Sequence, residues 1–266
     1  MLIDTHTHIA DPEFDPDRSE VIERATAAGV GKMILIGTDL SSSERAVALA
    51  GRYPFMWAAV GLHPHESNRA DDALYQALEK LADHPKVVGW GETGLDYYYD
   101  HSPRETQRRA FIEQIRLAQK QRLPLVIHTR EAWNETFEIL ENENVQQHAE
   151  EIGAVFHCFT GDKETAERAV ELGCYLSFSG IVTFPKATAL QEAAAWAPLE
   201  RIVVETDAPY LSPQGFRGKR NEPAFVRETA EKMARLRNCS FDDFSETTSR
   251  NADRLFKLPK TEPFPA

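Results

Sequence analysis

The chain has 266 residues, of which 42% are hydrophobic and 27% are charged, and this composition predicts a soluble globular protein with a large core. Its formal net charge of −12 argues against tight non-specific binding of nucleic acid through overall charge, but a small cationic site remains compatible with it, because bound metals are themselves large local charges. No run approaches the roughly 18 apolar residues of a membrane helix, the N-terminus lacks a signal-peptide pattern, and the three scattered cysteines predict a reducing cytoplasm rather than a disulfide framework.

Eight short apolar runs predict β-strands, and stretches of helical character separate them. Several runs, such as residues 33–36 and 125–127, are apolar without alternation, which is typical of strands buried on both faces in a parallel sheet. The predicted strands cover residues 2–5, 32–37, 56–61, 87–91, 124–128, 153–157, 173–178 and 201–205.

The connecting stretches carry local signals for the starts of helices. Ser41 followed by Glu44 matches a capping box, in which Ser41 would be the N-cap. Asp162 and Ser240 predict the N-caps of two further helices, and we expect the second to run over residues 241–256.

Strand and helix alternate throughout, which implies parallel pairing with right-handed crossovers. Eight such units fit a (β/α)8 TIM-type barrel, an α/β fold. An open doubly wound sheet is the structural alternative, but eight repeats without a Gly-rich phosphate-binding turn disfavour it. No linker or shift of composition divides the chain, so we expect one barrel domain over residues 1–258 and a short Pro-containing tail over residues 259–266.

Side chains that bind metals recur where the predicted strands end, which is where barrels of this kind carry their chemistry. His6 and His8 lie two residues apart near the end of the first strand, so both imidazoles point to the same side. A single histidine at a strand end is more often a hydrogen-bonded core residue than a ligand, but several that converge with carboxylates indicate a metal site. The other strand ends contribute His63, His65, Glu92, His128, His157 and Asp207.

Imidazole and carboxylate ligands together suit Zn²⁺, Mn²⁺, Fe²⁺, Co²⁺ or Ni²⁺, while Mg²⁺ is less natural on histidine-rich ligands. A set of this size is sufficient for two metal ions, with Glu92 as the bridging carboxylate. We therefore expect one or two divalent cations per subunit, with Zn, Mn or Mg as the candidates.

Six stretches carry recognisable motifs, namely Asp4-Thr5-His6-Thr7-His8, Gly61-Leu62-His63-Pro64-His65, Gly91-Glu92-Thr93-Gly94-Leu95-Asp96, His157-Cys158-Phe159-Thr160-Gly161, Glu205-Thr206-Asp207-Ala208-Pro209-Tyr210-Leu211 and Arg220-Asn221-Glu222-Pro223. In this order they resemble the TatD family of metal-dependent deoxyribonucleases, within the wider amidohydrolase-like group of metal barrels. The resemblance implies that the metal ligands are His6, His8, Glu92, His128, His157 and Asp207. Some family members lack the His-x-His pair that this chain keeps, and the wider group often carries a modified lysine where this chain has Glu92.

The function that we expect is hydrolysis of DNA phosphodiester bonds by a metal-activated water, with attack from a strand end. Asp207 and Glu92 are the predicted catalytic residues, since Asp207 can take the proton of the attacking water and Glu92 can bridge the metals. DNA is the expected partner, with no membrane and no obligate protein partner. The alternative is an amidohydrolase or esterase of a small C–N or C–O substrate, because the same metals can polarise a carbonyl. A metal-binding protein without catalysis is disfavoured by the complete ligand set.

Contacts to the substrate are predicted for four side chains near the strand ends, namely His63, His65, Arg130 and Arg220. Basic side chains can pair with phosphates, but a histidine fixed by a proline or a solvated loop cation is the plain alternative.

Two further features leave two interpretations open. The run Tyr97-Tyr98-Tyr99 either stacks on bases at the rim of the site or packs its loop onto the barrel. Glu205 either orients a metal ligand or ends its strand in a buried hydrogen bond.

Overall fold

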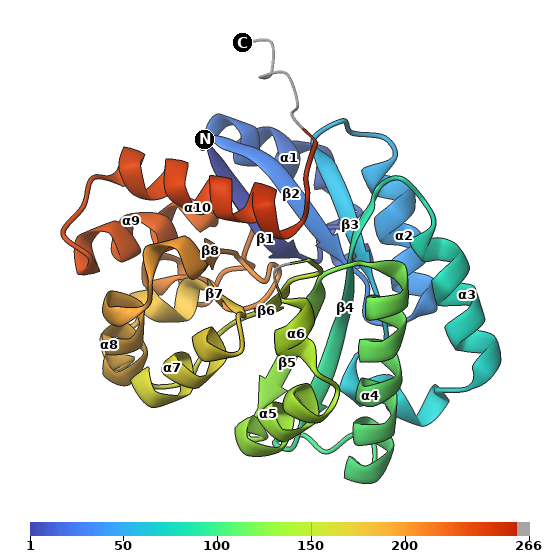
Figure 1. Ribbon diagram of the computed structural model, residues 1–266. Helices are drawn as coiled ribbons and strands as arrows, with labels where there is room; N and C mark the ends of the chain where they lie inside the picture. Colours follow the sequence, from blue (N-terminus) through green and yellow to red (C-terminus); the bar gives the residue numbers. More distant parts are fainter. Residues whose placement is uncertain (150, 260–266) are drawn as a thin grey trace.

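A computed structural model describes residues 1–149 and 151–259 of the chain. Eight strands, all paired in parallel, form one sheet in the order β1 to β8, and the helices surround it (Figure 1). The strands are β1 (Leu2–Thr7), β2 (Val30–Ile36), β3 (Met56–Val60), β4 (Val87–Asp96), β5 (Leu125–Arg130), β6 (Ala154–Phe156), β7 (Tyr175–Phe178) and β8 (Ile202–Val204). Each of them overlaps one of the eight predicted runs.

The sheet closes where its first and last strands meet. Thr7 pairs in parallel with Ala208, just beyond β8, and the hydroxyl of Thr5 donates to the carbonyl of Val204 at 3.0 Å. The predicted (β/α)8 barrel is therefore confirmed, with its strands nearly closed into a ring. Of the tail that the sequence predicted over residues 259–266, the part from residue 260 lies outside the described residues.

Helices connect successive strands and cover the outside of the barrel (Figure 1). None of the helices in the described residues is long and apolar enough to cross a membrane. The α-helices are α1 (Arg18–Ala27), α2 (Leu40–Ala50), α3 (Asp72–Ala82), α4 (Arg104–Gln121), α5 (Trp133–Asn142), α6 (Val145–His148), α7 (Lys163–Glu171), α8 (Thr188–Trp196), α9 (Val226–Leu236) and α10 (Phe241–Leu255). Short 3-10 helices lie at Pro12–Phe14, Pro64–Arg69, Gly180–Thr183, Leu199–Arg201, Gln214–Phe216 and Pro223–Phe225.

The predicted cap of α2 is wrong by two residues. The N-cap is Asp39, whose carboxylate accepts the amide of Ser42 at 2.7 Å, while the hydroxyl of Ser42 accepts the amide of Asp39 at 2.9 Å. Ser41 lies inside the first turn, because the capping box is built from Asp39 and Ser42 rather than from Ser41 and Glu44. The caps predicted at Asp162 and Ser240 are confirmed.

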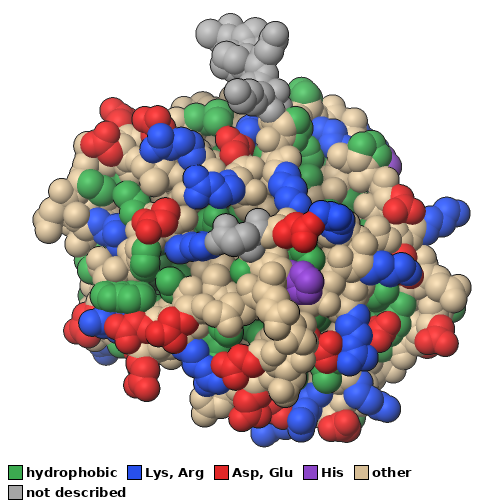
Figure 2. All heavy atoms as spheres, viewed as in Figure 1, with side chains coloured by type: hydrophobic (Ala, Val, Ile, Leu, Met, Phe, Trp, Pro, Cys, Tyr) green, Lys and Arg blue, Asp and Glu red, His purple; other side chains and the backbone are tan. Residues whose placement is uncertain are grey.

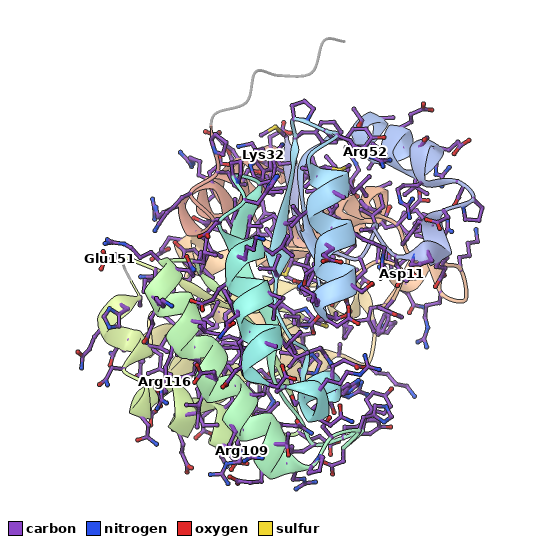
Figure 3. All side chains as sticks on the ribbon, turned by 90° about the vertical axis from the view of Figure 1, so that its right-hand side faces the viewer. Asp11, Lys32, Arg52, Arg109, Arg116 and Glu151 are labelled. Atoms are coloured by element: carbon purple, nitrogen blue, oxygen red, sulfur yellow. The ribbon has the colours of Figure 1, made fainter. Side chains whose placement is uncertain are left out.

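The interior of the barrel is packed with side chains and closed at the end where the strands begin. Strand residues such as Trp57 and Tyr175 form a buried cluster with Leu255 and Phe256 at the end of α10. Lys32, in β2, pairs with Asp253 of α10 at 2.5 Å, and Figure 3 shows Lys32 and Arg109 toward opposite ends of the barrel. Chemistry is therefore confined to the other end, where the strands terminate.

The strand β4 runs very close to β5 at Gly94. Gly94 has a φ of +141°, and a Cβ added there would overlap the backbone of His128, so the residue allows a close approach that no larger side chain permits. This contact fixes the position of β4 against β5 near the functional end of the barrel.

The substitution Gly94→Ala should lower the free energy of unfolding by about 2–3 kcal/mol, because the added methyl group forces β4 away from β5 at a strained φ. Thermal or urea denaturation measures the change. Gly215→Ala is the matched control, since its added Cβ meets nothing within 4 Å and should leave stability within about 0.5 kcal/mol of the parent. Equal stability of the two variants would contradict the proposed close approach.

Candidate metal centre

The six predicted metal ligands come together at the ends of the strands. Three of them lie in the strands β1, β4 and β5, and the other three lie in the segments that directly follow β1, β6 and β8. His6 is fully buried and Asp207 is 8% exposed, which places the group at the floor of an opening rather than on the surface. The residues are His6, His8, Glu92, His128, His157 and Asp207.

The first set of donor atoms surrounds a point between β1, β4 and β8. The Nε2 of His6 lies 3.3 Å from the Nε2 of His8, 3.4 Å from the Oε2 of Glu92 and 3.6 Å from the Oδ1 of Asp207. The Nε2 of His8 lies 3.4 Å from the same oxygen of Asp207. Four donors placed about 2.1 Å from a tetrahedral ion are roughly 3.4 Å apart, so this set fits one divalent cation.

The second set uses the other oxygen of Glu92. Its Oε1 lies 2.8 Å from the Nδ1 of His128 and 2.8 Å from the Nε2 of His157, and these two nitrogens are 3.3 Å apart. The Nε2 of His63 is 3.4 Å from the same oxygen. Glu92 thus presents one oxygen to each set, which is the arrangement that a bridging carboxylate requires.

The charges of the two sets depend on one another. Burial alone would raise the pKa of Glu92, but the neighbouring imidazoles, His157 foremost, hold that pKa well below its usual range. Burial would lower the pKa of His157, but the carboxylates of Glu92 and Glu205 raise it well above its ordinary value. Burial also opposes the charge of Asp207, yet its hydrogen bond with His8 lowers its pKa. Glu92 and Asp207 are therefore anionic at neutral pH, the form that binds a divalent cation.

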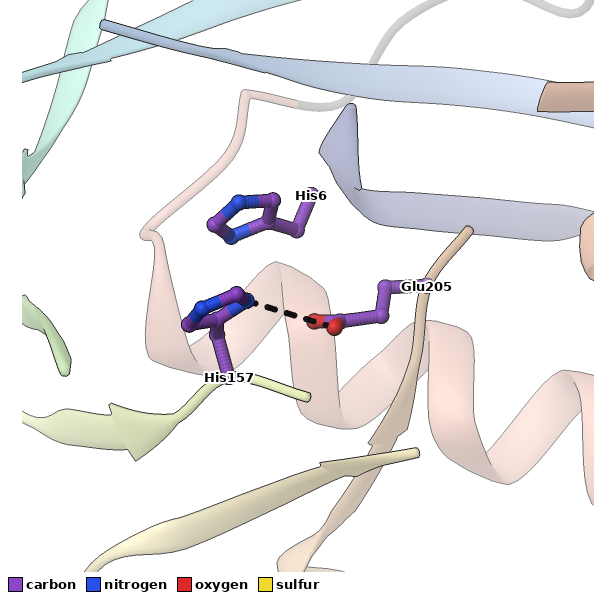
Figure 4. Close-up of side chains that lie close together, drawn as sticks. All are labelled: His6, His157 and Glu205. Atoms are coloured by element: carbon purple, nitrogen blue, oxygen red, sulfur yellow. Dashed lines mark ion pairs between the residues drawn. The ribbon is translucent and has the colours of Figure 1, made fainter. Parts of the chain in front are cut away.

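Glu205 lies next to one of the proposed ligands, His157. Figure 4 shows His6 and His157 with their rings stacked and Glu205 beside His157. The ring centroids are 3.9 Å apart, and Glu205 lies 3.4 Å from the Nδ1 of His157, on the side away from Glu92. Its two oxygens accept the amide of Cys158 at 2.7 Å and the hydroxyl of Ser177 at 2.5 Å. Both interpretations left open by the sequence are therefore compatible, since Glu205 is held by buried hydrogen bonds and also faces a ligand.

The sequence analysis assigned no role to two buried aspartates that hold the site together. Asp4 accepts the amide and hydroxyl of Thr206 at 2.9 and 2.6 Å, which ties β1 to the segment that carries Asp207. Asp96 lies 2.8 Å from the Nε2 of His65 and 3.2 Å from the Nε2 of His128. For Asp4 the available signal was a carboxylate within a run expected to be buried, next to His6 and His8, and for Asp96 it was a carboxylate in the same motif as Glu92.

A cavity of about 830 Å³ opens above the donor atoms. His63, His65 and Arg130 line it, together with His8, Glu92 and Asp207. Burial lowers the pKa of His63 to about 4, and its Nδ1 accepts the amide of His65, so the neutral ring carries its proton on the Nε2 that faces Glu92.

The fourth predicted substrate contact, Arg220, is directed elsewhere. Its guanidinium donates to the carboxylate of Asp17 at 2.6 and 2.8 Å and to the carbonyl of Glu13 at 3.0 Å, and it stacks over the ring of Phe14. The structure therefore brings Arg130 to the cavity but holds Arg220 against the start of α1, because an acidic partner distant in sequence is available there.

The sequence matches the family model described as TatD related DNase over residues 3–257. The chain belongs to this family. It is 40% identical to an uncharacterized metal-dependent hydrolase of Bacillus subtilis, YabD, over 97% of this chain and 100% of that protein. It is 35% identical to a protein of Salmonella typhimurium named 3'-5' ssDNA/RNA exonuclease TatD, over 97% of this chain and 99% of that protein.

A solved structure gives the same assignment. The crystal structure of YJJV, a TatD homologue from Escherichia coli, superimposes with a TM-score of 0.90 at 32% identity and covers 97% of this chain and 98% of that one. The resemblance inferred from the motifs is thus confirmed, and the chain is a metal-dependent hydrolase of the TatD family whose buried histidines and carboxylates could hold metal.

The substitution Glu92→Gln should weaken metal binding at both donor sets, because it replaces the shared anion by a neutral amide of equal size. We expect at least about a 100-fold loss of affinity, since removal of a group that only orients a ligand already costs about 10- to 100-fold. Metal content after dialysis, measured by mass spectrometry, gives the stoichiometry. Glu79→Gln, on α3 and paired with Lys120, is the control. A stoichiometry equal to that of the parent would show that Glu92 does not bridge.

Proposed function

We propose that this protein is a deoxyribonuclease that removes nucleotides from the end of a single strand, in the 3′-to-5′ direction. The observation that carries this proposal is the pair of donor sets joined by Glu92 at the floor of an open cavity. Paired cations are suited to in-line displacement at phosphorus, because they stabilise both the attacking and the leaving oxygen. The names of the exonuclease relatives support the choice of nucleic acid and of direction.

Two divalent cations per chain are part of this proposal. The ligands proposed for the first are His6, His8, Glu92 and Asp207, and those proposed for the second are Glu92, His128 and His157. Zn²⁺ or Mn²⁺ suits this histidine-rich set better than Mg²⁺. When bound, the cations would lower the pKa of a coordinated water and neutralise charge on the phosphodiester.

Asp207 is the proposed acceptor of the proton from the attacking water. It lines the cavity, it is held by His8, and its lowered pKa keeps it ionised. A carboxylate in this position can accept a proton within hydrogen-bond reach of a nucleophile bound at the first donor set.

Two side chains are proposed to hold the phosphate. His63 lines the cavity, and its Nε2–H faces the Oε1 of Glu92 at 3.4 Å; a phosphate oxygen is the proposed acceptor of this proton when substrate is bound. Arg130 is exposed in the same cavity and offers the planar donors that match a phosphate. His65 is fixed by Asp96 and we propose a positioning role for it, whereas Arg220 is left out because Asp17 occupies its guanidinium.

The distribution of charge favours a strand end over an extended duplex. On the face seen in Figure 2, which includes α10 at the end of the barrel where the strands begin, basic and acidic side chains are intermingled, and that face carries no basic stripe of the kind that follows a duplex backbone. The net charge of −12 points the same way. We also propose a cytoplasmic location, which the free thiols of Cys158, Cys174 and Cys239 support.

The function is tested by assaying the purified protein with Mn²⁺, Zn²⁺ or Mg²⁺ on end-labelled single- and double-stranded DNA. A panel of amides, lactones and carboxylic esters is assayed in parallel. We expect release of mononucleotides from the 3′ end of single strands. Turnover confined to the amide and ester panel would overturn the nuclease and favour the amidohydrolase alternative.

The substitution Asp207→Asn should leave the fold intact and reduce kcat on single-stranded DNA by about 10²- to 10⁴-fold, because the proton acceptor is lost. Metal content is measured on the same sample, so that loss of a ligand is separated from loss of the base. Asp83→Asn, exposed at the end of α3 and at the opposite end of the barrel, is the matched control. A variant at position 207 with parental kcat would exclude Asp207 as the base.

A further inference from the structure

Exposed aromatic rings gather at the mouth of the cavity. Apart from Met1, the exposed large apolar side chains of residues 1–149 and 151–259 are three tyrosines: Tyr98, Tyr99 and Tyr210, with 54%, 49% and 57% of their surface accessible. Two of the rings, Tyr99 and Tyr210, line the cavity above the donor atoms. Because these exposed rings line a cavity, a ligand that enters the cavity can cover them and remove their apolar surface from water.

These two rings stand on opposite sides of the opening. Tyr99 follows β4 and Tyr210 follows β8, and β4 and β8 are four strands apart in the ring of eight. A flat group that enters the cavity between them would meet one ring on each side of the mouth.

Tyr99 is held in place before any ligand arrives. The Oδ1 of Asp96 accepts the amides of Tyr98 and Tyr99 at 3.0 and 2.9 Å, which fixes the turn after β4. The ring of Tyr99 stacks parallel to that of His101, with an interplanar angle of 5° and centroids 5.5 Å apart. The guanidinium of Arg130 lies 4.7 Å from the centroid of Tyr99. A ring restrained in this way loses little side-chain entropy on binding.

Tyr210 connects directly to the first donor set. Its amide donates to the carbonyl of Asp207 at 2.8 Å, and its ring contacts that of His8 edge to face, with centroids 6.0 Å apart. Its backbone carbonyl accepts the side-chain amide of Asn221, which is fully buried. The ring of Tyr210 therefore lies directly beside His8, which is a proposed ligand of the first donor set.

We propose that Tyr99 and Tyr210 stack on the unpaired bases next to the scissile phosphate and thereby select single-stranded ends. This inference rests on the proposed nuclease function. Every base offers a π-face, so the two rings bind a strand end without reading its sequence. The faces of a paired base are already covered by its neighbours in a duplex, so a duplex end gains nothing from either ring until it frays.

A substrate that lacks the base tests the two rings directly. The kcat/KM of each protein is measured on a single strand with a normal 3′-terminal nucleotide and on the same strand with an abasic 3′-terminal residue. The parent should prefer the normal strand roughly 5- to 150-fold, the range that base–aromatic stacking supplies. Tyr99→Ala and Tyr210→Ala should each remove part of this preference, mainly by slowing the normal strand.

Tyr99→Phe and Tyr210→Phe are the matched controls, because they keep the ring and remove only the hydroxyl. Both should retain the parental preference for the terminal base. A loss of the preference in the phenylalanine variants equal to that in the alanine variants would overturn the stacking proposal, since it would assign the effect to the hydroxyl.

Binding without turnover provides the second readout. In metal-free buffer with a chelator, fluorescence anisotropy measures the Kd for a labelled single strand and for a blunt duplex. The alanine variants should bind the single strand several-fold more weakly than the parent, and the phenylalanine variants should bind it equally well. Identical Kd values for the parent and both alanine variants would overturn the proposal.

The outcomes separate this inference from the function beneath it. Equal cleavage of normal and abasic ends by the parent would support the proposed nuclease function and overturn the proposed stacking role of the two rings. Absence of cleavage on both strands, with turnover on the amide and ester panel, would overturn the nuclease and the role of the rings together.

Discussion

The carboxylate of Glu92 is the group on which the functional end of the barrel depends. Its two oxygens face His6 on one side and His128 and His157 on the other, at 2.8–3.4 Å, so one side chain joins donors from strands across the barrel. Burying a charge among imidazoles is weak evidence for stability, because desolvation offsets much of the attraction, whereas removing one partner leaves the rest unpaired. The cluster is therefore better explained by the chemistry that it performs than by the stability it contributes to the fold.

The proposed chemistry and the proposed recognition of substrate share a second carboxylate. One oxygen of Asp96 faces His65 and His128, and the other accepts the backbone amides of the turn that presents Tyr99. The position of a proposed metal ligand and the position of an exposed ring are thus set by the same buried group. Asp96 would therefore set the position of a base stacked on Tyr99 relative to the metal site, because it contacts both His128 and the turn that carries Tyr99.

One end of the barrel contributes to the stability of the fold, and the other end carries the candidate functional groups. At the end where the strands begin, α10 covers the packed interior and Lys32 pairs with Asp253, so that end contributes to stability. At the other end the loops are free to carry polar groups, because the strands beneath them already hold the backbone in place. Gly94 contributes at this functional end, because it lets β4 approach β5 closely beside His128, one of the proposed metal ligands.

The sequence by itself predicted the eight strands, the barrel and a set of metal-binding side chains at the strand ends, because apolar runs and residue types are local properties of the chain. The choice of six candidate ligands from that set came from the resemblance of its motifs to the TatD family. The sequence did not decide which neighbour each polar group would find. Arg220 pairs with Asp17, and the cap of α2 is Asp39, because several partners of similar chemistry were available and only packing selects among them. The same holds for Asp96, whose role depends on the closeness of β4 and β5. Pairings between residues far apart in sequence follow from the closed ring of strands, and only the tertiary structure decides them.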